Sequence, residues 1–425
     1  MTGLAKAVPL SGSVSAPWWQ QTPRAAWRSL ALGGLGWMFD VCDNFMLALT
    51  IPALIVVFGL SKSDAGAIGS VLAAGLVLGG IIGGGVADRI GRVRTLMLCV
   101  TIYSVFSGVT AFASSATTLG ALRFAAGLGM GGAWTAGAAL VAETWLPQHR
   151  GKGGALMQIG LPLGSMLAIA AVATVTALNG PLQNGGWRIV YGLGFLPALI
   201  VVPLAWNTKE PELWQAQTRL HAGATGSSLR VLLGSEHRSR LLLAFGFIFF
   251  AQYIYWGVFT WTPSFLVGAK HFDFVRSLAF TLAQQFGSLL GFLVFAWLVD
   301  WLGRRPAFLV YLLVGALSTA WLVLDTSPGG LLAATFLTGF GITGIFAGLG
   351  PLTAELAPPG AGRGLFMGLA YNGGRLGGIL APFLIGSLAS SDSGFMIGMA
   401  TAIPAFALAA LFVVLIPETK GMELR

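Results

Sequence analysis

Four charged side chains interrupt the most apolar stretches of this sequence. Asp40 and Asp43 lie in GWMFDVCDNFMLAL at residues 36–49, Arg123 opens RFAAGLGMGG, and Arg375 lies in AYNGGRLGGILAP. A charge at the centre of a membrane helix costs about 2.5 to 3.5 kcal/mol on insertion scales, so such residues usually face a cavity or a partner. These four residues are therefore the first candidates for chemistry.

The two aspartates are spaced for proton handling. Residues three apart share a face of a helix, so Asp40 and Asp43 are expected to point together toward a bundle interior. Two close carboxylates repel each other when both are ionised, so one of them can bind and release a proton near neutral pH. Depth along the spans favours an ion pair between Asp43 and Arg123, which leaves Asp40 free to titrate, although the reverse assignment stays open. Asp40, Asp43 and Arg123 form the predicted proton-coupling group.

Arg375 is the candidate anion-binding residue. The acidic residues of the second half lie at predicted span ends, and the planar guanidinium suits a carboxylate bidentately. An ion pair with Asp40 or Asp43 is the alternative. Polar and aromatic side chains at similar depth are expected to line the same cavity, although any one of the aromatic residues could simply pack. Together they suit a small organic acid with an apolar or aromatic body. They are Gln252, Tyr255, Trp256, Gln284, Tyr371, Asn372, Gln158 and, more weakly, Trp134.

Composition places the chain in a membrane. Of 425 residues, 56% are hydrophobic and 9% are charged, against roughly a quarter charged in soluble domains. The net charge of +9 comes from basic residues that flank apolar segments, which argues against nucleic acid as a partner. No nucleophile, metal-ligand or cofactor-binding pattern accompanies the histidines, which all lie in predicted loops, so an enzyme is not expected. These histidines are His149, His221, His237 and His271.

Twelve apolar segments are long enough to cross about 30 Å of hydrocarbon as helices. A polar segment separates two sets of six. The spans lie near residues 28–57, 65–88, 94–114, 117–143, 151–178, 187–206, 239–267, 275–301, 306–324, 329–355, 364–389 and 393–417. The predicted units are a tail at 1–27, a six-helix bundle at 28–206, a linker at 207–238, a second six-helix bundle at 239–417 and a tail at 418–425.

Charge predicts the orientation of these spans, because positive loops stay in the cytoplasm. With both termini inside, 18 of the 24 Lys and Arg residues fall in cytoplasmic tails and loops. Four fall outside, namely Lys62, Arg188, Lys270 and Arg276. We therefore expect a multi-pass protein with both termini in the cytoplasm.

The two halves repeat each other at an offset of 212 residues. Such a parallel repeat predicts a substrate site between the halves, near the bilayer midplane. Asp40 and Asp43 correspond to Gln252 and Tyr255, so the acids belong to the first half alone. The matching pairs are Asp88 with Asp300, Gly91 with Gly303, Arg92 with Arg304, Gly127 with Gly339, Gly129 with Gly341, and Glu143 with Glu355, while Arg150 matches Arg363 one residue later.

A loop motif gives the first family resemblance. GGVADRIGRVR at residues 84–94 resembles the G-x-x-x-D-R-x-G-R motif of the major facilitator superfamily, and AWLVDWLGRRP at 296–306 is a diverged second copy. The segments RFAAGLGMGG, AETWLPQHRG and PETKGMEL agree with it. The resemblance spans nearly the whole chain and implies an all-α membrane protein, with twelve transmembrane helices in two pseudo-symmetric bundles, that works as a monomer.

The same resemblance implies a gate. In such a family, charged residues of these loops form cytoplasmic latches that join the two bundles in the outward-facing state. A basic loop that only sets topology is the alternative interpretation. The expected gating residues are Asp88, Arg89, Arg92, Glu143, Arg150, Asp300, Arg304, Glu355 and Arg363.

A narrower resemblance concerns the substrate. DVCD at residues 40–43 is similar to the D-G-x-D motif of aromatic acid:proton symporters, with Val41 in place of Gly. Arg375 is similar to the arginine of those proteins and of the sialate and monocarboxylate:proton symporters. The resemblance implies proton-coupled import of a small aromatic or short-chain carboxylate across a bacterial inner membrane, by alternating access and without a cofactor. A sugar:proton symporter and a drug:proton antiporter are the alternatives.

Overall fold

The structure is a computed structural model of the chain. It describes residues 17–60, 62–220, 232, 234–259, 261–262, 265–266, 269–272, 274–358, 362–388 and 391–422. The predicted tails and linker are therefore described in part, and residues 1–16, 221–231 and 423–425 lie outside the described residues.

The first half of the chain folds into a bundle of long helices. Gly91, with a φ of 107°, ends one helix and starts the next, a backbone conformation that glycine adopts without strain. A short helix, α1 (Trp18–Gln21), precedes the bundle, and α10 (Glu212–Leu220) follows it. The bundle helices are α2 (Arg24–Phe58), α3 (Lys62–Ile90), α4 (Arg92–Val109), α5 (Ala116–Thr144), α6 (Arg150–Gln158), α7 (Gly160–Asn179), α8 (Gly186–Gly192) and α9 (Leu196–Trp206), with the 3₁₀ turns η1 (Thr110–Phe112), η2 (Leu182–Asn184) and η3 (Leu193–Phe195).

The second half repeats this arrangement. Gly303, with a φ of 102°, occupies the place of Gly91 in the repeat. One turn of π-helix, η4 (Tyr255–Phe259), extends the first helix of this half. The helices are α12 (Ser235–Ile254), α14 (Phe274–Leu302), α15 (Arg304–Leu324), α16 (Pro328–Leu356), α17 (Arg363–Gly374), α18 (Leu376–Leu388), α19 (Asp392–Ala400) and α20 (Ala402–Leu415).

Eleven helical stretches of the described chain are long and apolar enough to span a membrane. The one expected crossing that is missing from this set is the eleventh, near residues 364–389, which is split at Arg375 into α17, of 12 residues, and α18, of 13 residues. Glycines on both sides of Arg375 weaken the helix there. Among the amino acids, only proline has a lower helix propensity than glycine. With this broken helix, the number of crossings agrees with the sequence prediction.

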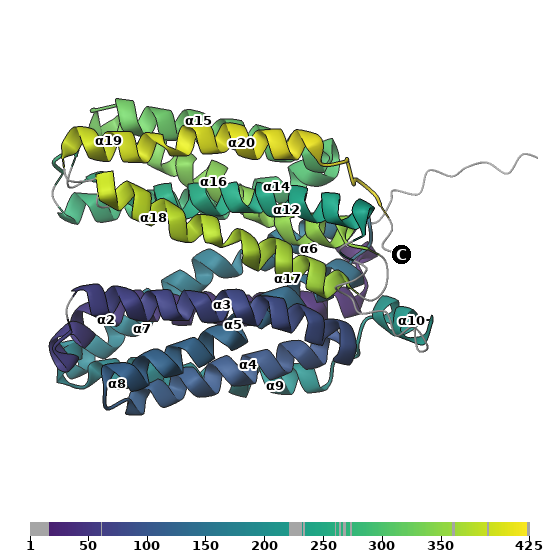
Figure 1. Ribbon diagram of the computed structural model, residues 1–425, viewed down its shortest axis with the longest axis horizontal. Coiled ribbons are helices and arrows are strands. Elements are labelled where there is room, and N and C mark those ends of the chain that lie inside the picture. Colours follow the sequence, from purple (N-terminus) through teal and green to yellow (C-terminus); the bar gives the residue numbers. More distant parts are fainter. Residues whose placement is uncertain are drawn as a thin grey trace, which may run out of the picture.

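The two bundles lie side by side and meet most closely at one end (Figure 1). We call this the latch end. It holds Asp88, Glu143, Asp300 and Glu355, and it is the end at which α10 and residues 416–422 lie. The opposite end, with the loops at residues 113–115 and 325–327, is called the far end. Across the interface α3 packs on α17, and α6 packs on α14 and α16.

Two glycines allow the closest approach between the bundles. A Cβ atom added to Gly84 of α3 would lie 2.2 Å from the carbonyl oxygen of Gly364 in α17, and one added to Gly364 would lie 2.4 Å from the carbonyl oxygen of Gly84. Small residues let helix backbones pack this tightly in membranes. The neighbouring Gly85 has open space at the same position.

Two glutamates bind the N-termini of helices that are equivalent in the two halves, α4 and α15. Glu210 in the linker accepts hydrogen bonds from the backbone N–H groups of Arg92, Val93 and Arg94, at 2.7, 3.0 and 3.0 Å, at the start of α4. Glu418 after α20 accepts from those of Arg304 and Arg305, at 2.8 and 3.0 Å, at the start of α15. A carboxylate satisfies the free donors and the positive dipole of a helix N-terminus.

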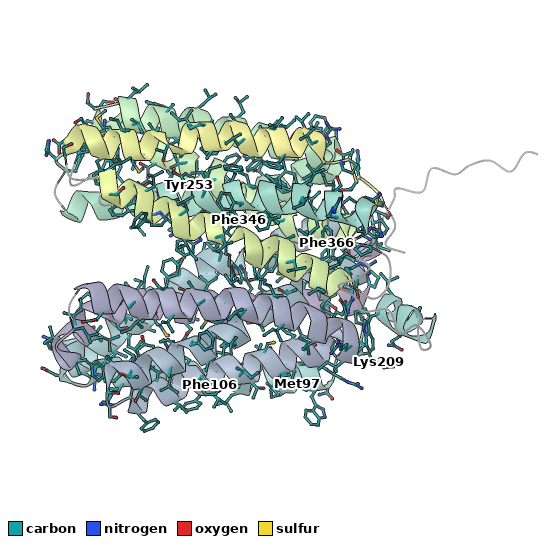
Figure 2. The ribbon with its side chains drawn as sticks, viewed as in Figure 1. Met97, Phe106, Lys209, Tyr253, Phe346 and Phe366 are labelled. Carbon is teal, nitrogen blue, oxygen red and sulfur yellow. The ribbon has the colours of Figure 1, made fainter. Side chains whose placement is uncertain are left out.

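Apolar side chains fill each bundle. Phe346 and Phe366, both buried, lie in the second bundle on the side near the first, while Phe106 and Met97 belong to α4 on the outer side of the first bundle (Figure 2). Large side chains such as Leu199 and Phe383 are exposed on the outside, as expected for helices that face lipid.

Candidate functional site

A cavity of about 260 Å³ lies between the two bundles. The part of α3 that lines it, from Gly69 to Val77, is the half remote from Asp88, so the cavity lies on the far-end side of the latch. The first bundle contributes Trp37, Asp40, Val41, Asn44, Phe45, Gly69, Leu72, Ala73, Leu76, Val77 and Leu161, and the second contributes Gln252, Tyr255, Trp256, Phe346, Tyr371, Arg375, Gly378 and Ile379.

One face of α2 supplies the polar groups of the first bundle. Trp37, Asp40, Val41, Asn44 and Phe45 follow one another at the three- and four-residue spacing of a helical face. Of these residues, Asp40 is predicted from the sequence, whereas Trp37, Asn44 and Phe45 are not. The same spacing around Asp40 could have found them.

Asp40 faces the cavity with a carboxylate oxygen that accepts no hydrogen bond. Its side chain is 2% exposed, and Oδ2 has no hydrogen-bond partner among the described residues. Arg375 lies close enough to act on it electrostatically from the other bundle. A buried polar atom without a partner is costly, so it marks a place for a proton or a ligand.

Asp43 lies in a different environment. It forms an ion pair with Arg123 at 2.9 Å, and the hydroxyl of Ser107 donates a further hydrogen bond to it. Three residues along a helix turn the side chain by about 300°, so neighbouring acids need not share one environment. The expectation that both acids face one interior was therefore wrong, although the pairing with Arg123 is the one that depth favoured.

Arg123 is itself fully enclosed in the first bundle. It donates a hydrogen bond to the Thr110 hydroxyl at 2.7 Å, and its guanidinium lies 4.8 Å from the ring centre of Tyr191. Ser107, Thr110 and Tyr191 were not identified from the sequence. Hydroxyl groups are common in membrane helices, and nothing in their spacing singles these out.

Arg375 occupies the break between α17 and α18. Its Nη1 atom has no hydrogen-bond partner within the described part of the chain. The guanidinium lies 5.3 Å from the ring centre of Tyr371, a cation–π arrangement. A planar cation with a free donor fits the requirement for binding an anion.

The rest of the second-bundle wall is aromatic with a few polar atoms. Trp256 donates a hydrogen bond to Gln252 at 3.0 Å, and Tyr255 stacks on Phe259 with ring centres 4.8 Å apart. Five of the predicted substrate residues thus line the cavity with Asp40, namely Gln252, Tyr255, Trp256, Tyr371 and Arg375.

The other four predicted substrate residues lie outside this lining. Trp134 and Gln158 border a smaller void of about 10 Å³ toward the latch end. Asn372 donates to Thr135 at 3.1 Å across the bundle interface, and Gln284 lies 3.5 Å from the Thr262 hydroxyl, buried within the second bundle. The sequence predicts how deep each residue lies along its membrane helix. It does not predict whether the side chain points into the cavity or into a bundle.

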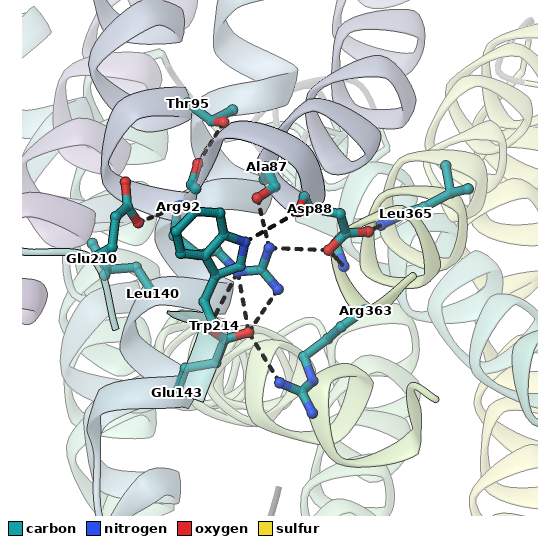
Figure 3. Close-up of polar contacts among 12 residues, drawn as sticks. Ala87, Asp88, Arg92, Thr95, Leu140, Glu143, Glu210, Trp214, Arg363 and Leu365 are labelled. Carbon is teal, nitrogen blue, oxygen red and sulfur yellow. Dashed lines mark hydrogen bonds and ion pairs between the residues drawn. The ribbon is translucent and has the colours of Figure 1, made fainter. Parts of the chain in front are cut away.

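Charged residues join the bundles at the latch end. Glu143 accepts from Arg92 at 2.9 Å within its own bundle and from Arg363 of α17 at 3.1 Å. Asp88 accepts from the backbone N–H groups of Gly364 and Leu365 at 2.9 and 3.1 Å (Figure 3). Both acids therefore bind the first turn of α17, where the helix dipole favours negative charge.

The second repeat copies this latch. Glu355 accepts from Arg304 at 2.9 Å within its own bundle and from Arg150 of α6 at 3.1 Å. Asp300 pairs at 2.9 Å with Lys152, which is not among the gating residues predicted from the sequence. Of the nine predicted gating residues, eight lie in this double network, and Arg89 is exposed beside it.

Known proteins show the same architecture. The chain matches the Major Facilitator Superfamily over residues 34–283 and 275–423. It belongs to this superfamily. The protein is thus a membrane transporter and not an enzyme, and no cluster of His, Cys, Asp and Glu in the described ranges could hold a metal ion.

Relatives of this transporter span nearly all of its length. It is 34% identical over 394 residues to a probable 4-methylmuconolactone transporter of Cupriavidus pinatubonensis, covering 92% of this chain and 90% of that protein. It is 30% identical to the cis,cis-muconate transport protein of Acinetobacter baylyi, covering 89% and 92%.

Solved structures confirm the fold of the transporter. The proton:xylose symporter XylE superposes with a TM-score of 0.77 at 20% identity, covering 94% of this chain and 97% of that one. The human organic anion transporter MFSD10 gives 0.71 at 18% identity, covering 92% and 100%. At these identities the likeness concerns the fold alone.

Proposed function

We propose that this transporter is a proton-coupled symporter that imports a small organic anion, an aromatic or short-chain carboxylate. The observation that carries the proposal is the pairing of Asp40 and Arg375 in one cavity. They come from opposite bundles, and each has a buried polar atom without a partner among the described residues. One is suited to a proton and the other to a carboxylate.

The relatives support this substrate class. They include proteins named as transporters of 4-methylmuconolactone, cis,cis-muconate, niacin, gentisate and 3-(3-hydroxy-phenyl)propionate. The cavity fits such molecules, because the aromatic side chains of Tyr255, Trp256 and Tyr371 line it together with the guanidinium of Arg375. Apolar walls with a few placed polar groups are usual for small-molecule sites.

The proposed cycle uses neutralisation. A proton on Asp40 and a carboxylate on Arg375 remove the two charges from the cavity together. The bundles can then rock without moving an uncompensated charge, which would otherwise cost several kcal/mol in a medium of low dielectric. Asp43 contributes by holding Arg123 away from the cavity, and the substrate leaves after Asp40 releases its proton.

The setting follows from the charge of the loops. We place the latch end in the cytoplasm of a bacterial inner membrane, with both termini there, because the positive loops lie at that end. The closed latch then corresponds to an outward-facing state. The transporter is proposed to act as a monomer and to need no cofactor, with protons as the coupling ion.

Two other substrates fit less well. A cationic drug exchanged for protons would be repelled by Arg375, which stays charged at any physiological pH. A neutral sugar could use Gln252 and Asn44 but would leave the Arg375 charge without a partner in the cavity. Neither alternative explains why the second bundle carries a half-buried cation at this place.

Uptake into proteoliposomes tests the proposal. Benzoate, nicotinate, lactate, xylose and a cationic dye would be offered under an inward proton gradient. We expect accumulation of a carboxylate, its loss in Arg375→Ala, and partial retention in Arg375→Lys, which keeps the charge without the planar fork. Carboxylate uptake by Arg375→Ala at the parent rate, or accumulation of xylose or the dye alone, would contradict the proposal.

A further inference from the structure

An aromatic pair joins the two bundles at the base of the cavity. Trp134 of α5 and Tyr371 of α17 are stacked, with ring centres 3.3 Å apart and planes 15° from parallel. Both side chains are at most 2% exposed. Each comes from a different bundle, so the stack can exist only while the bundles are together here.

The stack separates two spaces. Tyr371 lines the cavity that holds Asp40 and Arg375. Trp134 lines the small void toward the latch end, together with Ala138 and Gly350. The stacked pair therefore lies between the cavity and this void, on the latch-end side of the cavity.

Polar contacts tie each ring to its surroundings. The Arg375 guanidinium lies 5.3 Å from the ring centre of Tyr371, and the Tyr371 hydroxyl lies near the side chains of Arg375 and Gln252. The Trp134 Nε1 atom donates to Gln158 at 3.4 Å. The residue that binds the anion in the proposed function thus also holds one half of the stack.

We propose that the Trp134–Tyr371 stack is the inner gate of the cavity, and that Tyr371 is a positioning residue that couples this gate to occupancy of Arg375. The second part rests on the proposed function, since it requires an anion on Arg375. A carboxylate that takes the guanidinium bidentately competes with the Tyr371 hydroxyl for its donors. Tyr371 then loses the contact that fixes its ring, and the stack opens more readily as the bundles part.

The coupling follows from thermodynamics. A ligand shifts a conformational equilibrium only through interactions that differ between the two states. Here the difference is the Arg375–Tyr371 contact, present in the empty closed state and replaced when the anion is bound. Removing the Tyr371 hydroxyl should therefore make the stack open more readily when no anion is bound. Binding of an anion should then cause no further opening.

Thiol labelling beneath the stack tests this. Cys42 and Cys99, the two native cysteines, are replaced by alanine, and Ala138→Cys is introduced in the void. The protein is reconstituted in nanodiscs and treated with a membrane-impermeant maleimide, with and without benzoate at pH 5.5. In the parent background we expect slow labelling that benzoate accelerates.

Tyr371→Phe should label about two- to tenfold faster without benzoate, and benzoate should add nothing further. Tyr253→Phe is the matched control, because this tyrosine of the same bundle donates to Thr401 at 2.9 Å, away from the stack. The control should label like the parent. Parent-like labelling of Tyr371→Phe with an intact benzoate response would overturn the proposal.

A second variant separates the gate from the binding site. Trp134→Ala removes the stack from the other bundle, so it should speed labelling while benzoate affinity stays within about twofold of the parent. Unchanged labelling in this variant would also overturn the gate. Benzoate binding by the parent is measured by calorimetry. If no carboxylate binds, the proposed function fails, whereas the ligand-free labelling rates still decide whether the stack is a gate.

Discussion

Asp43 and Arg123 form a buried ion pair of 2.9 Å within the first bundle, one helical turn from the partnerless Asp40. The two acids of the DVCD segment therefore have different roles. Asp43 compensates a fixed cation, and Asp40 presents a carboxylate to the cavity. This difference leads to opposite expectations for the same substitution at the two positions.

Asp43→Asn should destabilise the protein strongly. It leaves the Arg123 guanidinium buried without a counter-charge, which typically costs about 3–5 kcal/mol. The free energy of unfolding in mixed micelles measures the loss. The double variant Asp43→Asn with Arg123→Gln should recover most of it, because both charges are then removed. An Asp43→Asn single variant as stable as the parent would show that the pair is not needed.

Asp40→Asn should leave stability within about 1 kcal/mol of the parent, because the side chain makes no hydrogen bond or ion pair with the described residues. It should instead uncouple transport, since asparagine cannot carry a proton. Counterflow of labelled carboxylate between equal concentrations should persist, while accumulation driven by a pH gradient should disappear. Gradient-driven accumulation at the parent level would remove Asp40 from the proton pathway.

Gly84→Ala should disfavour the closed latch. The added methyl group would meet the Gly364 carbonyl oxygen at 2.2 Å, and backbone cannot move aside cheaply. Spin labels on the exposed positions Arg89 and Trp301 report the separation of the bundles at this end. We expect a larger population of long distances than in the parent. Gly85→Ala, with open space around it, is the matched control and should leave the distance distribution unchanged.

Glu210→Ala should lower the free energy of unfolding by about 1–2 kcal/mol, because three backbone donors at the start of α4 lose their acceptor. Glu212→Ala, two residues away and exposed, should have little effect. Chemical unfolding of both variants in the same detergent makes the comparison. Equal stability of the two would indicate that water replaces the carboxylate at no cost.

The sequence was sufficient for the architecture, because hydrophobic length, loop charge and the internal offset are all properties of the chain itself. It also located Asp40, Asp43, Arg123 and Arg375, since a charge in an apolar run is conspicuous. The eight latch residues were found from the repeat, because each has a counterpart in the other half of the chain. Both halves fold in the same way, so the counterparts occupy equivalent places at the latch end.

The sequence could not supply what depends on side-chain direction and on close packing. Asp40 and Asp43 face different spaces although they are three residues apart. The α3 wall of the cavity consists of Gly69 and apolar residues, which carry no chemical signal. The Trp134–Tyr371 contact joins residues more than two hundred positions apart, and only the docking of one bundle on the other brings them together.

The glutamates that cap α4 and α15 make each half self-sufficient at this point. Glu210 stands after the sixth crossing and Glu418 after the twelfth, and each returns to the start of the third crossing of its own half. The acceptor for each helix start therefore comes from the same half of the chain. These two helix ends keep their acceptors when the bundles move relative to each other.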